Sequence, residues 1–309
     1  MRVIGDLLFI GSLTLASCVS MRTAFAADAV PTPSVALITL DGVIDQDADD
    51  TPAFTPGGDV VFFDRTDGPR KTVMESRLVQ GKWSPPRPAS FSGRWFDQDP
   101  VMAPDGRYLL FNSDRPVLPG SNPLVQHYFG RGAAPGSNIW RVDRKGDGWG
   151  EPVWLGLPID DDVFIDFASI AADGTIYYMR VNAPSNGTHI WRSRLQAGHY
   201  LAPEFVPLGD PDEPTHDPAI APDQSFIVFD YGRVAGGLGR LSIAFKEGDR
   251  WGPRIDLGDA INNSRPWGAH VAADGRTLHF TDQTGIHQMS LEPLLRAHSK
   301  VGGLASDRG

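Results

Sequence analysis

The sequence predicts an all-β protein, a β-propeller of five blades. Three observations support this fold: a phrase of twelve residues occurs five times, a second spacing recurs downstream of it, and turn-forming residues are abundant. The 309 residues include 34 Gly and 26 Pro. Such a composition is typical of many tight turns between short strands rather than of a helical protein.

The repeated phrase consists of two apolar runs around a turn, as in Asp99–Phe111. Its alternating residues, rich in β-branched and aromatic side chains, predict two antiparallel strands joined at Asp-Gly. An aromatic residue ends each copy, eleven residues after the start. The copies begin at Pro52, Pro100, Phe167, Pro218 and Ala269.

Two further strands follow the hairpin. An apolar residue and an aromatic residue stand ten positions apart downstream of four copies: Val73 and Trp83, Ile139 and Trp149, Ile190 and Tyr200, and Leu241 and Trp251. We expect the tryptophans to pack between blades. A Pro soon after the aromatic residue suits the start of an edge strand. Four strands per repeat of about 50 residues is the pattern of a propeller blade.

The last copy lacks a fourth strand of its own, because Gly285–Leu291 is followed by a stretch, Glu292–His298, that could form a helix. We expect the N-terminal segment Val35–Leu40 to supply the missing strand and to close the ring, which removes both open edges. One domain over residues 34–300 and a disordered tail over 301–309 follow from this interpretation. A ring of six blades is the alternative.

The first 26 residues predict an export signal. Arg2 precedes the apolar stretch Leu7–Ala16, which is too short to span a bilayer. Leu15–Cys18 resembles the bacterial lipobox, which implies a lipid on Cys18, whereas Ala24–Ala26 is an alternative site for ordinary signal peptidase. A third interpretation is an incidental Cys in a cleaved signal. We expect an exported protein, either periplasmic or attached to the outer membrane as a lipoprotein.

Composition and missing motifs exclude several function classes. The net charge of −10 argues against nucleic acid as a partner. The sequence contains no H-E-x-x-H, no G-x-S-x-G and no phosphate-binding loop. We expect no cofactor and no metal centre, although His216 and His270, near inner-strand entries of adjacent blades, could hold a single ion.

Three motifs, Asp97–Arg115, Trp149–Gly156 and Gly236–Gly239, resemble the TolB-type propeller repeat. The resemblance covers nearly the whole chain after the export signal. It implies the propeller fold and is poor evidence for one activity, since such repeats occur in periplasmic, peptidase and lipoprotein families. TolB itself has six blades and a separate N-terminal domain, for which this chain has no room, so a direct Tol-system role is not expected.

Candidate site residues gather where the channel opens, because the innermost strands of all blades enter there. The candidates are the carboxylates Asp99, Asp166 and Asp217, the arginines Arg65, Arg115, Arg180 and Arg233 at the ends of second strands, the aromatic residues Trp95, Phe164 and Trp267, and His216. We expect the insertion Pro116–Ser137 to project from the same face, as a lid, a partner-contact loop or an inert insertion.

Three interpretations of these residues stay open. The acids and bases could be structural, pairing within and between blades, or they could bind a protein, peptide or envelope glycan. A glycan-active hydrolase is the further alternative, since glycoside hydrolysis needs two carboxylates and Asp99, Asp166 and Asp217 could provide them. Asp105, Asp173 and Asp274 precede the turn glycine or its equivalent at the opposite face, and their role is structural.

Overall fold

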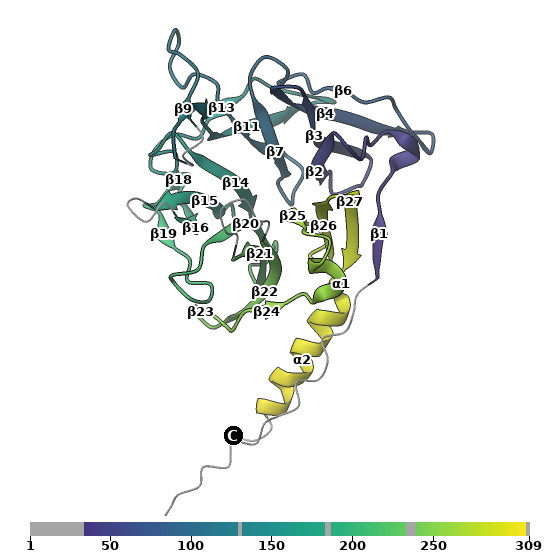
Figure 1. The fold of residues 1–309 in the computed structure, drawn as a ribbon, viewed down its shortest axis with the longest axis vertical. Helices are drawn as coiled ribbons and strands as arrows, with labels where there is room; N and C mark the ends of the chain where they lie inside the picture. Colours follow the sequence, from purple (N-terminus) through teal and green to yellow (C-terminus); the bar gives the residue numbers. More distant parts are fainter. Residues whose placement is uncertain (1–33, 129–131, 183–186, 233–238, 307–309) are drawn as a thin grey trace, which may run out of the picture.

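The structure is a computed structural model that describes residues 34–128, 132–182, 187–232 and 239–306. Five antiparallel sheets surround a central channel (Figure 1). The innermost strands are β2 (Asp49–Phe54), β7 (Asp97–Met102), β14 (Ile165–Ile170), β20 (Thr215–Ile220) and β25 (Trp267–Val271). Each pairs with the next strand along the chain through a tight turn. The five-bladed propeller expected from the repeats is confirmed.

The remaining strands complete the blades in chain order. The second strands are β3 (Val60–Asp67), β8 (Tyr108–Ser113), β15 (Ile176–Asn182), β21 (Phe226–Tyr231) and β26 (Thr277–Asp282). The third strands are β4 (Arg70–Val79), β11 (Asn138–Lys145), β16 (Gly187–Ser193), β22 (Arg240–Glu247) and β27 (Gly285–Ser290). The outer strands are β6 (Arg87–Pro88), β13 (Val153–Trp154), β19 (Glu204–Phe205), β24 (Ile255–Asp256) and, in the fifth blade, β1 (Val35–Leu37).

Short elements connect or extend these strands. They are β5 (Lys82–Trp83), β9 (Val125–Gln126), β10 (Ala134–Pro135), β12 (Gly148–Trp149), β17 (Leu195–Gln196), β18 (His199–Tyr200), β23 (Arg250–Trp251), the 3₁₀ turn η1 (Leu40–Gly42) and the helix α1 (Asp259–Asn262). The C-terminal helix α2 spans Glu292–Ser306, so residues 301–306 are helical where the sequence predicts a disordered tail. Within the described ranges, no helix is long and apolar enough to cross a membrane.

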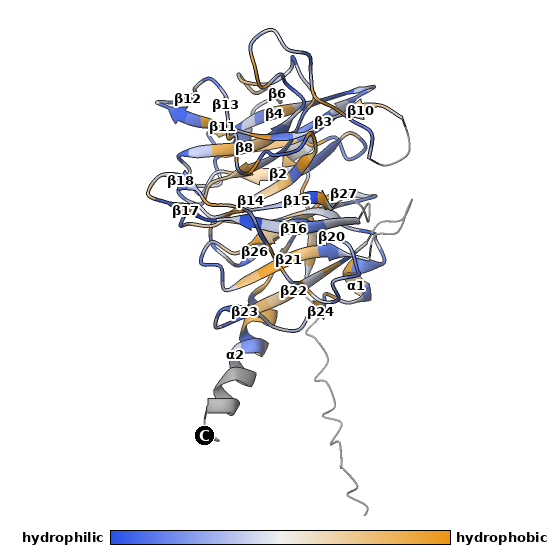
Figure 2. Cartoon of the chain, turned by 90° about the vertical axis from the view of Figure 1, so that its left-hand side faces the viewer, coloured by the Kyte–Doolittle hydropathy of each residue, from blue (hydrophilic) through white to orange (hydrophobic). Residues whose placement is uncertain are grey.

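The core is divided into layers between neighbouring blades. Each of the five main apolar clusters draws its buried side chains from two adjacent blades. Trp149 of the second blade packs edge-on against Phe62 of the first, with ring centroids 5.4 Å apart, and Trp251 of the fourth meets Tyr177 of the third at 6.5 Å. Apolar residues follow strands such as β21 and β22 in the side view (Figure 2). The tryptophans expected between blades therefore hold neighbouring sheets together.

The N-terminal strand closes the ring as the sequence predicts. β1 pairs antiparallel with β27, placing Val35 opposite Met289 and Leu37 opposite His287. The backbone N–H of Ile38 extends the ladder by donating to the carbonyl of Ile286 at 2.8 Å. First and last segments of the propeller thus share one sheet.

In four blades, a polar side chain that follows the outer strand in the sequence accepts a hydrogen bond from a backbone N–H of the third strand. Ile139 N–H donates to Asp160 Oδ1 at 3.0 Å, and Leu241 N–H donates to Asn262 Oδ1 at 2.8 Å. In the first and third blades, the hydroxyl groups of Ser92 and Thr215 are the acceptors. Asn262 also donates to the carbonyl of Leu241, a bond that a carboxylate cannot make.

We expect Asp160→Asn to stabilise the protein. Burial raises the pKa of Asp160 from its ordinary value of 3.8 to about 8. Because the folded pKa lies above the unfolded one, the native state loses stability as the pH rises from 4 to 8. The neutral amide removes this loss. In thermal denaturation the variant should exceed the parent in Tm by a margin that grows between pH 5 and pH 8; a constant or negative margin would contradict the assignment.

Removal of residues 1–38 should destabilise the ring, whereas removal of residues 1–33 should not. The longer deletion takes away β1 and Ile38, which is 7% exposed. Burial of one such side chain is worth about 1.5–3 kcal/mol, and 1 kcal/mol shifts Tm by roughly 2–4 °C in a domain of this size. Equal Tm values for the two deletions, measured by circular dichroism, would show that closure contributes nothing.

Candidate ligand site at the channel mouth

Each innermost strand contains a β-bulge near its start. The bulged residues are Thr51, Asp99, Phe167, Asp217 and Gly268, with φ between +46° and +58°. This left-handed conformation suits Gly and is tolerated by Asp, but it is costly for a β-branched Thr. A Cβ on Gly268 would also lie 2.6 Å from Thr51 Cγ2. The neighbouring bulges are therefore packed against one another.

The bulges connect adjacent blades through their backbone N–H groups. Asp99 N–H donates to Asp64 Oδ2 of the first blade at 3.0 Å, and Gly268 N–H donates to Asp217 Oδ2 of the fourth at 3.2 Å. Thr51 N–H donates to Thr281 Oγ1 of the fifth blade at 3.2 Å. In all three cases the acceptor belongs to the preceding blade of the ring. The side chains at the mouth are thus built into the blade contacts.

In the third blade, the hairpin turn is one residue shorter than the alignment of the five repeated copies implies. Its hairpin is closed by Ala171 N–H and the carbonyl of Thr175, four residues apart, whereas Ala103 and Tyr108 of the second blade are five apart. A turn shorter by one residue places Phe167, and not Asp166, at the bulge. Asp166 takes the position that Gln98 has in the second blade, opposite Met179. The equivalence of Asp166 with Asp99 is therefore wrong.

Two carboxylates of the first blade lie close to one lysine. Lys71 Nζ is 3.2 Å from both oxygens of Asp50 and 3.4 Å from Asp64 Oδ2. Asp64 also accepts from Thr51 Oγ1 at 2.8 Å and is fully buried. Burial by itself lowers the pKa of Lys71. The carboxylates of Asp64, Asp50 and Asp99 outweigh this effect, so the pKa of Lys71 is raised. Lys71 is therefore the cation that compensates this part of the cluster.

Asp99 is the least compensated of these acids. Its side chain is 1% exposed, and within the described residues neither carboxylate oxygen has a hydrogen-bond partner. Burial, together with the charges of Asp166 and Asp64, raises the pKa of Asp99 well above its usual range. A buried carboxylate without donors is costly unless it is protonated or meets a ligand.

Asp166 is positioned by two donors from the second blade and its insertion. Ser137 Oγ donates to Asp166 Oδ1 at 2.7 Å, and Gln98 Nε2 donates to the same oxygen at 3.2 Å. Burial raises the pKa of Asp166 to about 6, although these bonds oppose the shift. The charge of Asp217 adds to the increase. Asp99, Asp166 and Asp217 thus form one electrostatically connected group.

The predicted arginines pair with other acids. Arg65 makes two 2.6 Å bonds to Asp49, and Arg115 contacts Asp97 at 2.7 Å. Arg180 lies 3.2 Å from Asp161. Arg65, Arg115 and Arg180 are thus each engaged by an acid other than Asp99, Asp166 and Asp217. Arg233 lies outside the described residues.

The other candidates are aromatic residues and histidines. Trp95 is partly exposed beneath the guanidinium of Arg94, 4.8 Å from the ring centroid, and Trp267 is partly exposed on β25. His216 is buried, with Nδ1 2.7 Å from Thr188 Oγ1 and 3.3 Å from Met179 Sδ. His270 instead lies opposite His279 in its own blade. In the described ranges, no three His, Cys, Asp or Glu side chains are grouped to hold a metal.

The insertion of the second blade packs beside the entry of the third. Ser137 bridges to Phe164 in parallel, and its N–H donates to the carbonyl of Val163 at 2.9 Å. Tyr128 Oη donates to Asp162 at 2.5 Å and contacts the Phe164 ring. The insertion therefore lies at the mouth, where it positions Asp166.

Sequence reasoning missed Asp64 and Lys71. Asp64 directly follows the aromatic residue that ends its copy of the repeated phrase, and this position could have identified it. The five residues at this position are Asp64, Asn112, Met179, Asp230 and Thr281, four of them polar at the end of an apolar strand. The turn acids behave as expected: Asp105, for example, accepts from Arg107 N–H at 2.9 Å.

Known proteins share the fold with this chain. No family model and no curated protein sequence matches it. Endo-arabinase from Bacteroides thetaiotaomicron is 14% identical with a TM-score of 0.51, covering 79% of this chain and 93% of that one. Hydrazine synthase from Kuenenia stuttgartiensis is 12% identical with a TM-score of 0.51, covering 76% and 36%. TolB from Acinetobacter baumannii is 17% identical with a TM-score of 0.38, covering 80% and 45%, so this chain spans less than half of it.

We expect Asp99→Asn to stabilise the protein at pH 7. The amide removes an uncompensated charge from the cluster, and Asn tolerates the left-handed backbone of this position. Differential scanning calorimetry should show a higher Tm for the variant than for the parent. Asp105→Asn, at an exposed turn, is the matched control and should leave Tm within about 1–2 °C of the parent, as for most surface changes. A lower Tm for Asp99→Asn would mean that the Asp99 carboxylate has stabilising partners.

Proposed function

We propose that this protein is an exported β-propeller of the cell envelope that binds a glycan, a peptide or a protein segment through its channel mouth. The carboxylate of Asp99 carries the proposal: it is buried, it has no donor among the described residues, and it stands beside Asp64 and Asp166. A buried polar group without partners lowers the stability of the folded protein. Proteins commonly accept this cost where the group is needed for binding.

The chemistry of the cluster favours a ligand rich in hydrogen-bond donors. Carboxylates accept hydrogen bonds and cannot donate them when ionised. Hydroxyl groups of a sugar, or N–H groups of a peptide, would satisfy Asp99 and the second oxygen of Asp64. Trp95 and Trp267, both partly exposed, offer faces on which a sugar ring or a side chain can stack.

A glycan-active hydrolase is the second candidate, favoured by the unequal environments of the acids. The pKa of Asp99, which has no hydrogen-bond donor among the described residues, is raised well above its usual range. Asp166 accepts hydrogen bonds from Ser137 and Gln98, and burial raises its pKa only to about 6. One ionised and one protonated carboxylate are the groups that glycoside hydrolysis requires.

Placement at the envelope rests on the N-terminal segment. Leu15–Cys18 and the apolar stretch before it lie in residues 1–33, outside the described part of the chain. The proposal is that a lipid on Cys18 or cleavage after Ala26 leaves the propeller in the periplasm or on the outer membrane. Mass spectrometry of the exported protein distinguishes a diacylglyceryl Cys18 from a chain that begins at Ala27.

A thermal-shift screen of residues 27–309 against envelope oligosaccharides and peptides tests the binding function. A ligand present at 100 times its Kd should stabilise the domain by about 2.7 kcal/mol. Asp99→Asn should lose this ligand-induced shift while remaining folded, and Asp105→Asn should retain it. If no oligosaccharide or peptide shifts the Tm, or if Asp99→Asn responds like the parent, the proposed site is wrong.

Product analysis separates binding from hydrolysis. A hydrolase should release reducing ends from a stabilising oligosaccharide, and Asp166→Asn should bind it without releasing product. An intact ligand after prolonged incubation with the parent would leave binding as the function.

A further inference from the structure

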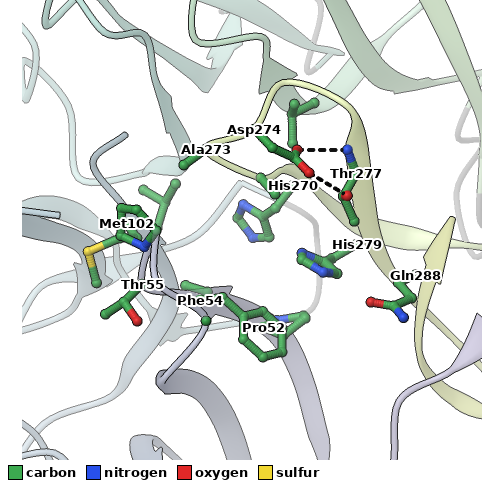
Figure 3. A pocket seen from close by; sticks show the side chains of 16 residues that line it. Pro52, Phe54, Thr55, Met102, His270, Ala273, Asp274, Thr277, His279 and Gln288 are labelled. Carbon is green, nitrogen blue, oxygen red and sulfur yellow. Dashed lines mark hydrogen bonds between the residues drawn. The ribbon is translucent and has the colours of Figure 1, made fainter. Parts of the chain in front are cut away.

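A cavity of about 300 Å³ lies at the other end of the channel, where the hairpin turns of the blades gather. It is lined by the ends of the innermost strands β2, β7 and β25, and by the β25–β26 hairpin (Figure 3). Its walls include Phe54, Met102, His270, His279 and Gln288. This volume is at the lower end of the range for small-molecule sites.

Two histidines form the polar wall. His270 on β25 and His279 on β26 stand directly opposite each other in the antiparallel ladder, with both rings in the cavity (Figure 3). His270 is 7% exposed, and within the described residues neither ring nitrogen has a hydrogen-bond partner. Burial lowers the pKa of each ring to about 4. Both imidazoles are therefore neutral near pH 7, each with one donor and one acceptor nitrogen.

The second histidine is held more firmly than the first. The His279 ring packs against Phe54, with centroids 4.8 Å apart, and Gln288 is within hydrogen-bonding reach of it. For His270, no described residue satisfies the ring nitrogens in this way. Polar groups buried this deeply are normally paired, so His270 is the group that a ligand would satisfy.

The remaining walls exclude charged ligands. Of the lining residues, all of them within the described ranges, none is Lys or Arg, and the acid is Asp274. Its carboxylate already accepts from Arg276 N–H, Thr277 N–H and Thr277 Oγ1 at 2.8–2.9 Å. An anion would find no cation here, and a cation would find no free carboxylate.

The apolar walls favour a flat ligand. Phe54 contributes an aromatic ring to the wall and Met102 a thioether, and such groups pack well against planar molecules. We propose that this cavity is a second ligand site, which takes a small uncharged planar molecule whose single polar group hydrogen-bonds to His270. None of the channel-mouth acids Asp99, Asp166 and Asp217 lines this cavity, although the charge of Asp217 reaches His270. The site adds a function that the proposed binding module does not include.

Three probes that share one ring and differ in charge test the proposal: benzyl alcohol, benzoate and benzylamine. Ligand-observed NMR against the full domain at pH 7 should detect benzyl alcohol, with at least about tenfold weaker binding for the two charged probes, which corresponds to about 1.4 kcal/mol. The His270 ring nitrogens should shift on addition of benzyl alcohol in a long-range ¹⁵N spectrum of the parent. Equal binding of benzoate, binding of none of the probes, or an unshifted His270 would overturn the proposal.

Two variants assign the site. His270→Leu keeps an apolar volume but removes both nitrogens, and it should weaken benzyl alcohol at least about tenfold. His189→Leu removes an equally buried histidine of the third blade, which packs on Phe205, and should bind benzyl alcohol like the parent. Should His270→Leu fail to fold, the ¹⁵N shifts of the parent still decide the question. Asp99→Asn should leave benzyl alcohol binding unchanged, which separates this site from the channel mouth.

Discussion

The pairing of β1 with β27 is the constraint on which the ring depends. A propeller buries its apolar residues between blades, so each sheet needs a neighbour on both sides. Here the five clusters include one that joins the N-terminal segment and the first blade to the last blade through Ile38 and Ile286. Without β1, the fifth blade would expose an unpaired edge, and the contact that turns a row of blades into a ring would be weakened.

Closure brings the five innermost strands around one axis, and the bulges then determine what faces it. A bulge rotates the backbone so that its N–H reaches the preceding blade, as from Asp99 to Asp64. The same arrangement brings carboxylates of different blades close together. The charge at the mouth is therefore a consequence of how the blades are joined, and Lys71 compensates only part of it.

The two ends of the channel differ in chemistry although they belong to the same strands. At the entry, buried acids raise one another's pKa, and the result is a group that accepts hydrogen bonds. At the turns, His270 and His279 are kept neutral by burial and stand against apolar walls. Each end holds a buried polar group, Asp99 or His270, that has no hydrogen-bond partner in the part of the chain that the structure describes. Such groups are the features of a scaffold that most often mark binding sites.

The sequence by itself determined the fold class, the number of blades and the strand that closes the ring, because hydrophobic alternation and turn residues recur locally in every repeat. It also placed the turn acids, each of which accepts a hydrogen bond from the backbone N–H two residues further along the chain. It misplaced Asp166, because the copies are aligned on their final aromatic residue; Asp173 stands six residues after Phe167, as Asp105 stands six residues after Asp99. Only the tertiary structure decided which acids meet, that Lys71 lies among them, and that His270 faces His279 across a cavity. These contacts join different strands and blades, and their distances and burial depend on how the sheets pack, which no local pattern encodes.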